Sequence, residues 1–406
     1  MIWILALGCL AVVGLAGYYQ GPVRAVFSLG GIIFGMLLAS PLAPLTRHLL
    51  PLLGLHHPAW EVLAPNLLAF LIVLLLFKIA GAIVHNRVAH YYKYQRDEVL
   101  YFRWQRLYSR LGLCVGVFNG ALYFFLLMLP IYIAGYFTTE LQAQRAPPGA
   151  QFLTSAREDL HQAKLDRVLA KHDPTPDAVY EASDIVALVL HNPLLESRLS
   201  HYPPLLTLGE QKEFQDLATD VDLQQMIQSQ AKVSDILARP EIRAIVTNGD
   251  TVTLVINTLA GEPPHTNLLQ DLYQYLLTGK SAQFDSEPMY GIWGVDLNAS
   301  VAEERKRNKE LTPLQLRLLK LELAPEISGL TLKATTDDQM ILKRDTPNTV
   351  LPVIVARGTW KKGDDDYEVT IPGNKPDKVA VLIENSNRLL LPRGGHTLVF
   401  NKEIVY

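Results

Sequence analysis

Apolar positions are concentrated in the first third of this 406-residue chain. Four nearly uncharged segments lie at about residues 2–19, 25–45, 60–84 and 111–137. At a rise of about 1.5 Å per residue, each can cross a hydrocarbon core of about 30 Å as a helix, the first with some strain. The pattern therefore predicts four transmembrane helices.

The middle of the chain, residues 142–286, has the spacing of amphipathic helices. Apolar residues recur three and four positions apart, as at Val179, Ala182, Ile185, Val186 and Val189. Further apolar repeats follow residues that favour a first helical turn, namely Pro193, Asp222 and Pro240. Their irregular spacing predicts a small bundle of short helices and not a solenoid. The β-branched stretch 251–259 could pass for a strand, but its neighbours favour a helix.

From about Pro288 the pattern changes to short alternating segments separated by turn residues. The predicted strands are 291–296, 330–335, 340–343, 353–361, 367–371, 379–383, 389–391 and 397–401. A charged helix at 301–324, interrupted at Thr312-Pro313, lies between the first two strands. Evenly spaced strands with hairpin turns predict an antiparallel meander that curls into a barrel or half-barrel.

The expected fold class is a multi-domain membrane protein with three parts. These are a four-helix transmembrane domain at 1–140, an α-helical spacer at 141–287 and a C-terminal antiparallel β domain at 288–406. We interpret the first apolar segment as a retained helix, because no Lys or Arg precedes it and no clean small-residue cleavage site follows it. A cleaved signal peptide is the alternative.

Two of the apolar segments carry small residues four positions apart, so that they stack on one helix face. The two sets are Gly31, Gly35 and Ala39, and Gly112, Gly116 and Gly120. In lipid, smooth faces of this kind let helix backbones approach closely and gain dispersion contact. We therefore predict that both faces pack against other helices, although glycine is also simply common in membrane helices.

Basic residues are concentrated between the third and fourth apolar segments. Residues 85–110 carry six Lys or Arg against Asp97 and Glu98, whereas the two earlier connections carry one arginine each. Placing the basic loop in the cytoplasm puts both chain ends, and the soluble two thirds, outside. The loop is also rich in aromatic residues, and beside membrane helices this favours an interfacial amphipathic helix on anionic lipid over RNA binding.

Composition and motifs give no sign of an enzyme. The net charge of −3 gives no reason to expect nucleic acid as a partner, and the only cysteines are Cys9 and Cys114. The sequence has no HExxH, GxSxG or P-loop motif. His56-His57 is interpreted as a surface loop and Gly363–Asp366 as a polar hairpin tip, so no catalytic residue, cofactor or metal is expected.

The first segments resemble a known family. Residues 17–30, Gly-Tyr-Tyr-Gln-Gly-Pro-Val-Arg-Ala-Val-Phe-Ser-Leu-Gly, are similar to the start of the colicin V production protein family, and 107–112 with Gly116 and Gly120 are similar to its last helix. The resemblance covers about residues 1–140. It implies a bacterial inner-membrane protein linked to toxin production and envelope maintenance, without established catalytic residues.

The β domain resembles a small bacterial lipocalin-like domain. The similarity rests on Gly291-Ile292-Trp293, Gly358-Thr359-Trp360 and the terminal stretch 398–402. We expect Trp293 and Trp360 to fill the barrel core, because buried tryptophan chiefly supplies apolar area. If a cavity remains, an apolar ligand such as a lipid is its natural occupant.

The expected function is that of a non-enzymatic inner-membrane protein, implicated by the resemblance in colicin V production or export and in envelope maintenance, that anchors a periplasmic β domain. The alternative is a protein that binds a lipid or small apolar ligand through the lipocalin-like domain. Transport through the helices is a third reading, against which the scarcity of ionisable residues argues. Expected partners are membrane lipids, envelope or export proteins and a second copy joined through the glycine faces.

Overall fold

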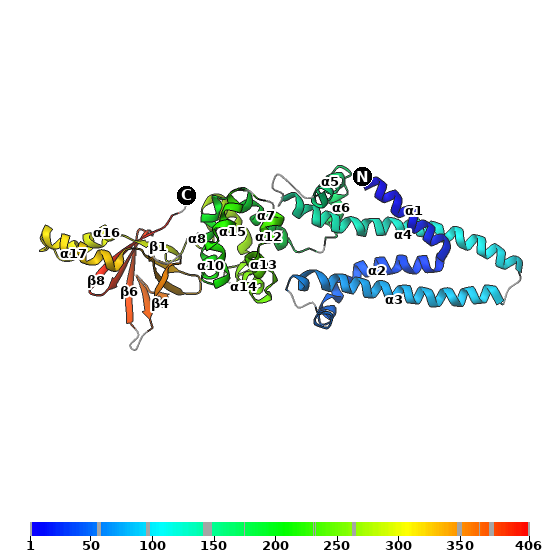
Figure 1. The fold of residues 1–406 in the computed structure, drawn as a ribbon. Coiled ribbons are helices and arrows are strands. Elements are labelled where there is room, and N and C mark those ends of the chain that lie inside the picture. The colour runs from blue at the N-terminus through cyan, green and yellow to red at the C-terminus, as the bar shows by residue number, and fades with distance from the viewer. Residues whose placement is uncertain are drawn as a thin grey trace. The chain divides into compact units, whose positions relative to one another are not determined.

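The computed structural model describes residues 2–54, 58–94, 98–140, 148–173, 175–229, 231, 233–261, 265–346, 351–364, 366–372 and 377–404 (Figure 1). The chain divides into two compact units. Unit 1 comprises residues 1–183 with 247–249, and unit 2 comprises 184–246 with 250–406. The three-part division expected from the sequence stays a prediction.

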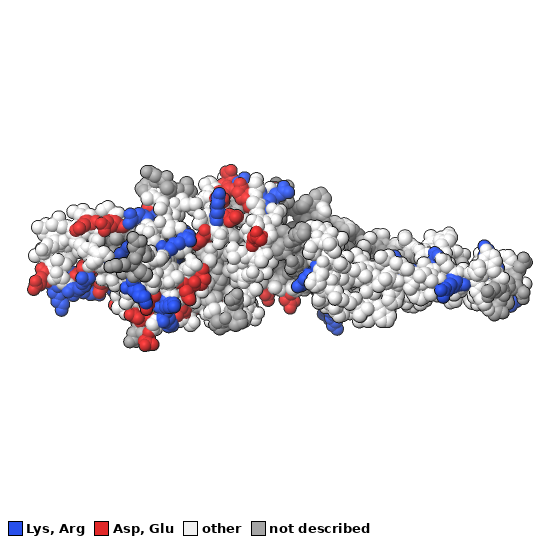
Figure 2. Space-filling model, turned by 90° about the horizontal axis from the view of Figure 1, so that it is seen from below, with Lys and Arg blue, Asp and Glu red and all other residues white. Residues whose placement is uncertain are grey.

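Unit 1 contains four helices that are long and apolar enough to cross a membrane, as predicted. They are α1 (Ile2–Gln20), α2 (Pro22–Arg47), α3 (Pro58–Tyr94) and α4 (Glu98–Glu140), with a short 3-10 turn η1 (Pro51–Leu53) after α2. α1 packs along α4, and α2 packs along α3. On the face seen in Figure 2, the surface of these helices is largely free of charged groups.

Local sequence explains where these helices begin and end. Gly21 has φ +84 and precedes Pro22 at the first turn of α2, so the chain turns sharply between α1 and α2. The basic stretch 85–110, for which the sequence favours an amphipathic helix, is mostly helical, because α3 continues to Tyr94 and α4 begins at Glu98. No glycine or proline interrupts those residues, so the helices extend past their apolar parts.

Shorter helices complete unit 1. α5 (Pro148–Gln162) and α6 (Asp166–Ala170) pack against α4, and α7 (Asp177–His191) begins there and continues into unit 2. Ile2 and Met128 share a buried core with Leu160 and Leu169. The backbone N of Ile2 also donates to Oδ2 of Asp159 at 3.4 Å. The start of α1 and the end of α4 therefore meet at α5.

The helical part of unit 2 is a set of short helices, as predicted. They are α8 (Leu195–His201), α9 (Pro203–Leu208), α10 (Lys212–Thr219), α11 (Val221–Gln228), α12 (Val233–Leu237), α13 (Pro240–Thr247), α14 (Gly249–Ala260) and α15 (Leu268–Thr278). The β-branched stretch lies in helix α14, which confirms the favoured interpretation. Asp222 lies in the first turn of α11, and Asp220 caps it by accepting from Leu223 N.

The rest of unit 2 is a closed antiparallel barrel, which confirms the predicted meander. Its strands are β1 (Gly291–Val295), β2 (Leu330–Ala334), β3 (Gln339–Arg344), β4 (Val353–Lys362), β5 (Tyr367–Ile371), β6 (Asp377–Glu384), β7 (Arg388–Arg393) and β8 (His396–Lys402). Each strand pairs with the next, and β1 pairs with β8 to close the ring. α16 (Leu297–Arg307) and α17 (Pro313–Ile327) lie between β1 and β2 in the chain (Figure 1).

Side chains fill the barrel interior. Trp293 is completely buried and donates from Nε1 to the backbone oxygen of Met289 at 3.0 Å, and Trp360 is 3% exposed. Both belong to one buried cluster with Leu332, Val369, Phe400 and other inward residues of the strands. An eight-stranded barrel is narrow enough to be filled by its own side chains. The buried cluster makes this interior a packed core.

Within unit 2, the helical part is tied to the outside of the barrel by a buried ion pair. Met340 and Leu342 of β3 point into the barrel core, whereas Lys343 points outward. Lys343 is nevertheless buried, and the cost of burying its ammonium group is offset because its Nζ donates to Oε1 of Glu210 at 2.8 Å. Lys333 of β2 donates to the same oxygen at 3.0 Å. The Glu210 carboxylate thus joins two neighbouring strands to the turn between α9 and α10.

Candidate functional site

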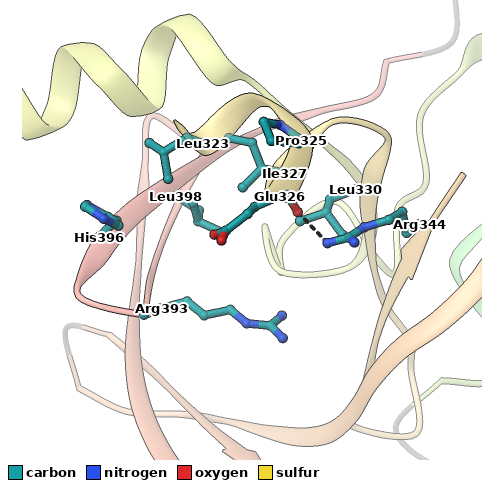
Figure 3. Close-up of a pocket in the computed structure, with 10 residues that line it drawn as sticks. Leu323, Pro325, Glu326, Ile327, Leu330, Arg344, Arg393, His396 and Leu398 are labelled. Carbon is teal, nitrogen blue, oxygen red and sulfur yellow. Dashed lines mark hydrogen bonds between the residues drawn. The ribbon is translucent and has the colours of Figure 1, made fainter. Parts of the chain in front are cut away.

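A pocket of about 440 Å³ opens at one mouth of the barrel (Figure 3). It lies between the last turn of α17, the start of β2, the end of β3 and the turn between β7 and β8. Its lining residues are Leu323, Pro325, Glu326, Ile327, Leu330, Arg344, Arg393, Gly394, His396 and Leu398. This volume is within the usual range of small-molecule sites.

Local sequence places the elements around the pocket. Thr312 and Gln315 form a reciprocal cap at the start of α17, which fixes where that helix begins. Gly329 has φ +70 and turns the chain from α17 into β2. Gly394 and Gly395, both at positive φ, form the tight turn that brings Arg393 and His396 to the same rim.

The polar groups of the pocket are mainly cationic. Arg344 donates from Nη2 to the backbone oxygen of Glu326, and its Nε is buried without a hydrogen-bond partner among the residues that the structure describes. The exposed side chain of Arg393 extends into the space beneath Glu326 (Figure 3). Nδ1 of His396 lies 3.9 Å from Oε1 of Glu304. Charged groups from three separate segments therefore converge at one opening.

The walls of the pocket are apolar. Leu323, Ile327, Leu330 and Leu398 are each less than 5% exposed and belong to the barrel core cluster. A molecule in the pocket would contact these side chains on one side and the arginines on the other. The sequence singled out none of these residues as a binding site, because they are spread over residues 323–398 and only the folded ring brings them together. The Gly394-Gly395 turn was the one local signal.

The predicted glycine face of α4 lies directly against α1. A Cβ atom added at Gly112 would lie 2.3 Å from the backbone oxygen of Gly17, and one at Gly116 would lie 2.8 Å from the backbone oxygen of Val13. At Gly120 the nearest atom would be Cα of Leu10, at 3.0 Å. These three glycines therefore permit contact between two helix backbones. Gly17 on α1, for which the sequence pattern predicts no packing role, completes that contact.

The predicted face of α2 lies against α3 in a different way. A Cβ atom at Gly31 would lie 2.9 Å from Cβ of Phe77, and one at Gly35 would lie 2.8 Å from the ring of Phe70. Ala39, the third predicted member, is half-buried on α2. The α2 glycines therefore accommodate aromatic side chains of α3, and the nearest α3 backbone atoms, Cα of Leu74 and the backbone oxygen of Phe70, would each lie 3.5 Å from the added Cβ atom.

Polar side chains also join the ends of the apolar helices. Arg24 donates from Nη2 to Oδ1 of Asn86 at 3.4 Å, and Asn119 donates from Nδ2 to the backbone oxygen of Ala25 at 2.8 Å. His85 and Tyr108 are also hydrogen-bonded to each other. Among the residues that the structure describes, no group of three or more His, Cys, Asp or Glu is arranged to hold a metal ion. His56 and His57 lie outside those residues.

Comparison with known proteins gives one match, which lies in the N-terminal part of the chain. The family model of the colicin V production protein matches residues 3–100. The match spans α1, α2 and α3 and ends at the start of α4, so the glycine face of α4 lies beyond it. No curated protein and no solved structure matches the chain. The N-terminal part of the chain is therefore similar to the colicin V production protein family, over helices that are long and apolar enough to cross a membrane.

Proposed function

We propose that this protein is a non-enzymatic component of the bacterial inner membrane that holds its β-barrel in the periplasm, and that it serves toxin production or export and envelope maintenance. The observation that carries the proposal is the family match over residues 3–100, joined to four helices that can span a bilayer. Its proposed partners are membrane lipids and envelope or export proteins.

The arrangement of unit 1 supports this orientation. Four consecutive spans return the chain to the side on which it started, and Ile2 indeed lies beside α5, which follows the fourth span. The basic residues of 85–110 lie at the end of α3 and the start of α4, away from the end of α4 that lies beside Ile2 and α5. The excess of Lys and Arg favours the cytoplasm for that end.

The remaining proposed partner is a second copy of the chain. A homo-oligomer through the glycine faces would compete with the packing of those faces against helices of the same chain.

Reporter fusions test the orientation. Alkaline phosphatase, which folds only in the periplasm, is expected to be active when fused after Tyr406 and inactive when fused after Lys93 at the end of α3. A fluorescent protein that matures only in the cytoplasm should give the reverse pattern at the same two sites. An inactive phosphatase at Tyr406 with cytoplasmic fluorescence there would reject the proposed placement.

A second candidate function is the binding of a lipid or small apolar ligand by the barrel domain, and the pocket favours it. Because the barrel interior is packed, the ligand would occupy the mouth beside α17 and not the centre of the ring. Mass spectrometry of the intact purified protein is expected to show a bound small molecule. Ile327→Trp should abolish binding of the small molecule, because the larger side chain fills the pocket. Leu382→Trp, at an exposed position on β6, should leave the bound molecule in place. Equal occupancy in both variants would exclude this site.

A further inference from the structure

We propose that the barrel-mouth pocket takes a single-chain amphipathic anion, in which one carboxylate or phosphate group is joined to one apolar chain. The proposal rests on the second candidate function, since it names the ligand class of the same pocket. Three features carry it: the net charge of the lining, the fixed position of one arginine, and the dry apolar wall.

The lining carries an excess positive charge. Two arginines, Arg344 and Arg393, face one carboxylate, Glu326, so the pocket has a net charge of +1 when His396 is neutral. Neither arginine forms an ion pair within the part of the chain that the structure describes. One monoanion would balance this charge. A guanidinium group suits that role, because its planar donors match two oxygens of a carboxylate or phosphate.

One of the two arginines is already held in position. Arg344 is the last residue of β3 and pairs with Leu330 and Val353 in the neighbouring strands. Its bond to the Glu326 carbonyl fixes one edge of the guanidinium, and its buried Nε keeps an unused hydrogen. Arg393 reaches toward it from the opposite rim (Figure 3). An anion between the two would therefore meet one donor group fixed by a hydrogen bond and one exposed donor group.

The apolar wall selects for a chain attached to the anion. Leu323, Ile327 and Leu398 face the same space as the arginines (Figure 3). A bare phosphate ion has no apolar part to pack against this wall and would gain nothing from it. At about 440 Å³, the pocket is the size of a single-chain molecule and is smaller than a two-chain phospholipid. A fatty acid, a lysophospholipid and an alkyl phosphate share the required chemistry.

The test uses the full chain in nanodiscs of neutral lipid and a fluorescent fatty acid, 11-(dansylamino)undecanoic acid, with empty nanodiscs as the baseline. Arg393→Gln is expected to weaken binding about 10- to 100-fold, because a hydrogen bond to a charged group is worth about 1.5–3 kcal/mol and 1.4 kcal/mol is tenfold. Arg393→Lys should restore part of the affinity. Arg317→Gln is the matched control, since Arg317 is exposed on α17 outside the pocket lining, and it should change affinity less than twofold.

Other probes separate this inference from the function on which it rests. The methyl ester of the same probe has no anionic group and is expected to bind weakly and with no response to Arg393→Gln. Equal binding of the ester and the acid would overturn the anion inference and leave apolar ligand binding intact. Competition by inorganic phosphate as strong as that by dodecyl phosphate would overturn the role of the apolar wall. Binding no stronger than to empty nanodiscs would overturn both the inference and the second candidate function.

Discussion

Replacing Glu210 by glutamine is expected to lower the free energy of unfolding of unit 2 by about 3–5 kcal/mol. The Glu210 side chain is 8% exposed and accepts hydrogen bonds from Lys333 and Lys343. The Lys343 side chain is equally buried, so the amide would leave its ammonium group out of water without a counter-charge. Removing one partner of a buried pair is costly because the other charge loses both water and its partner.

Denaturant unfolding of the full chain measures this loss, followed by the fluorescence of Trp293 and Trp360 after the other three tryptophans are changed to phenylalanine. Glu368→Gln is the control, because it removes the Glu368 to Lys378 pair at the surface, where an ion pair contributes little. Adding Lys343→Met to Glu210→Gln should recover part of the stability, since no buried charge then remains at that position. Equal losses for the two glutamine variants would refute the assigned role.

The same carboxylate is expected to make unit 2 less stable in acid. Burial alone raises the pKa of Glu210, but the hydrogen bonds and charges of Lys343 and Lys333 outweigh burial and hold that pKa below its ordinary value. The unfolded chain has the higher pKa, about 4.3, so the stabilising contribution is complete above that pH. It is lost as the pH falls through the lowered pKa of Glu210. The Glu210→Gln chain should lack this part of the acid sensitivity.

Gly112→Ala is expected to weaken the contact between α1 and α4 by about 1–3 kcal/mol or more. The added Cβ would lie 2.3 Å from the backbone oxygen of Gly17 and 2.9 Å from Cα of Gly21. A side chain could rotate away from this clash, but a helix backbone cannot. The two helices must therefore move apart and lose dispersion contacts along their length.

Cys9 provides the measurement, because its Sγ lies 3.4 Å from the backbone oxygen of Gly120 at the same helix contact. In a chain with Cys114→Ser, maleimide labelling of Cys9, which is half-buried at this contact, is expected to become faster in Gly112→Ala, because separation of α1 and α4 exposes its Sγ further. Gly8→Ala is the control on α1, where an added Cβ has no atom within 4 Å. Unchanged labelling in Gly112→Ala would show that the helices do not depend on this close approach.

The helices and strands of this protein can be predicted from local patterns in the sequence. The closure of the strands into a ring cannot. Uncharged runs of about twenty residues identify the membrane helices, and alternation with turn residues between segments identifies the strands. The pairing of β1 with β8 joins Val295 to Phe400 and has no local signal, which is why the sequence allowed a half-barrel as well as a barrel. The capped helix at Thr312-Pro313 could be predicted because capping is local.

The candidate site could not be predicted from the sequence, because its residues come together only in the folded chain. Spacing four apart predicts that Gly112 and Gly116 share a helix face, but it does not identify Gly17 as the residue opposite. Arg344 and Arg393 each look like an ordinary strand-end residue on a soluble domain. Their common pocket depends on the closure of the ring and on the position of α17, both of which are long-range properties.

The closing pair of the barrel has a consequence for biosynthesis. β1 leaves the ribosome well before β8, and the whole of α16, α17 and six strands is made between them. Until β8 has been translated, β1 has an unsatisfied edge that can pair with another nascent chain. The barrel can therefore close only after its last strand has been made, and the interval before closure is the stage at which aggregation through β1 would occur.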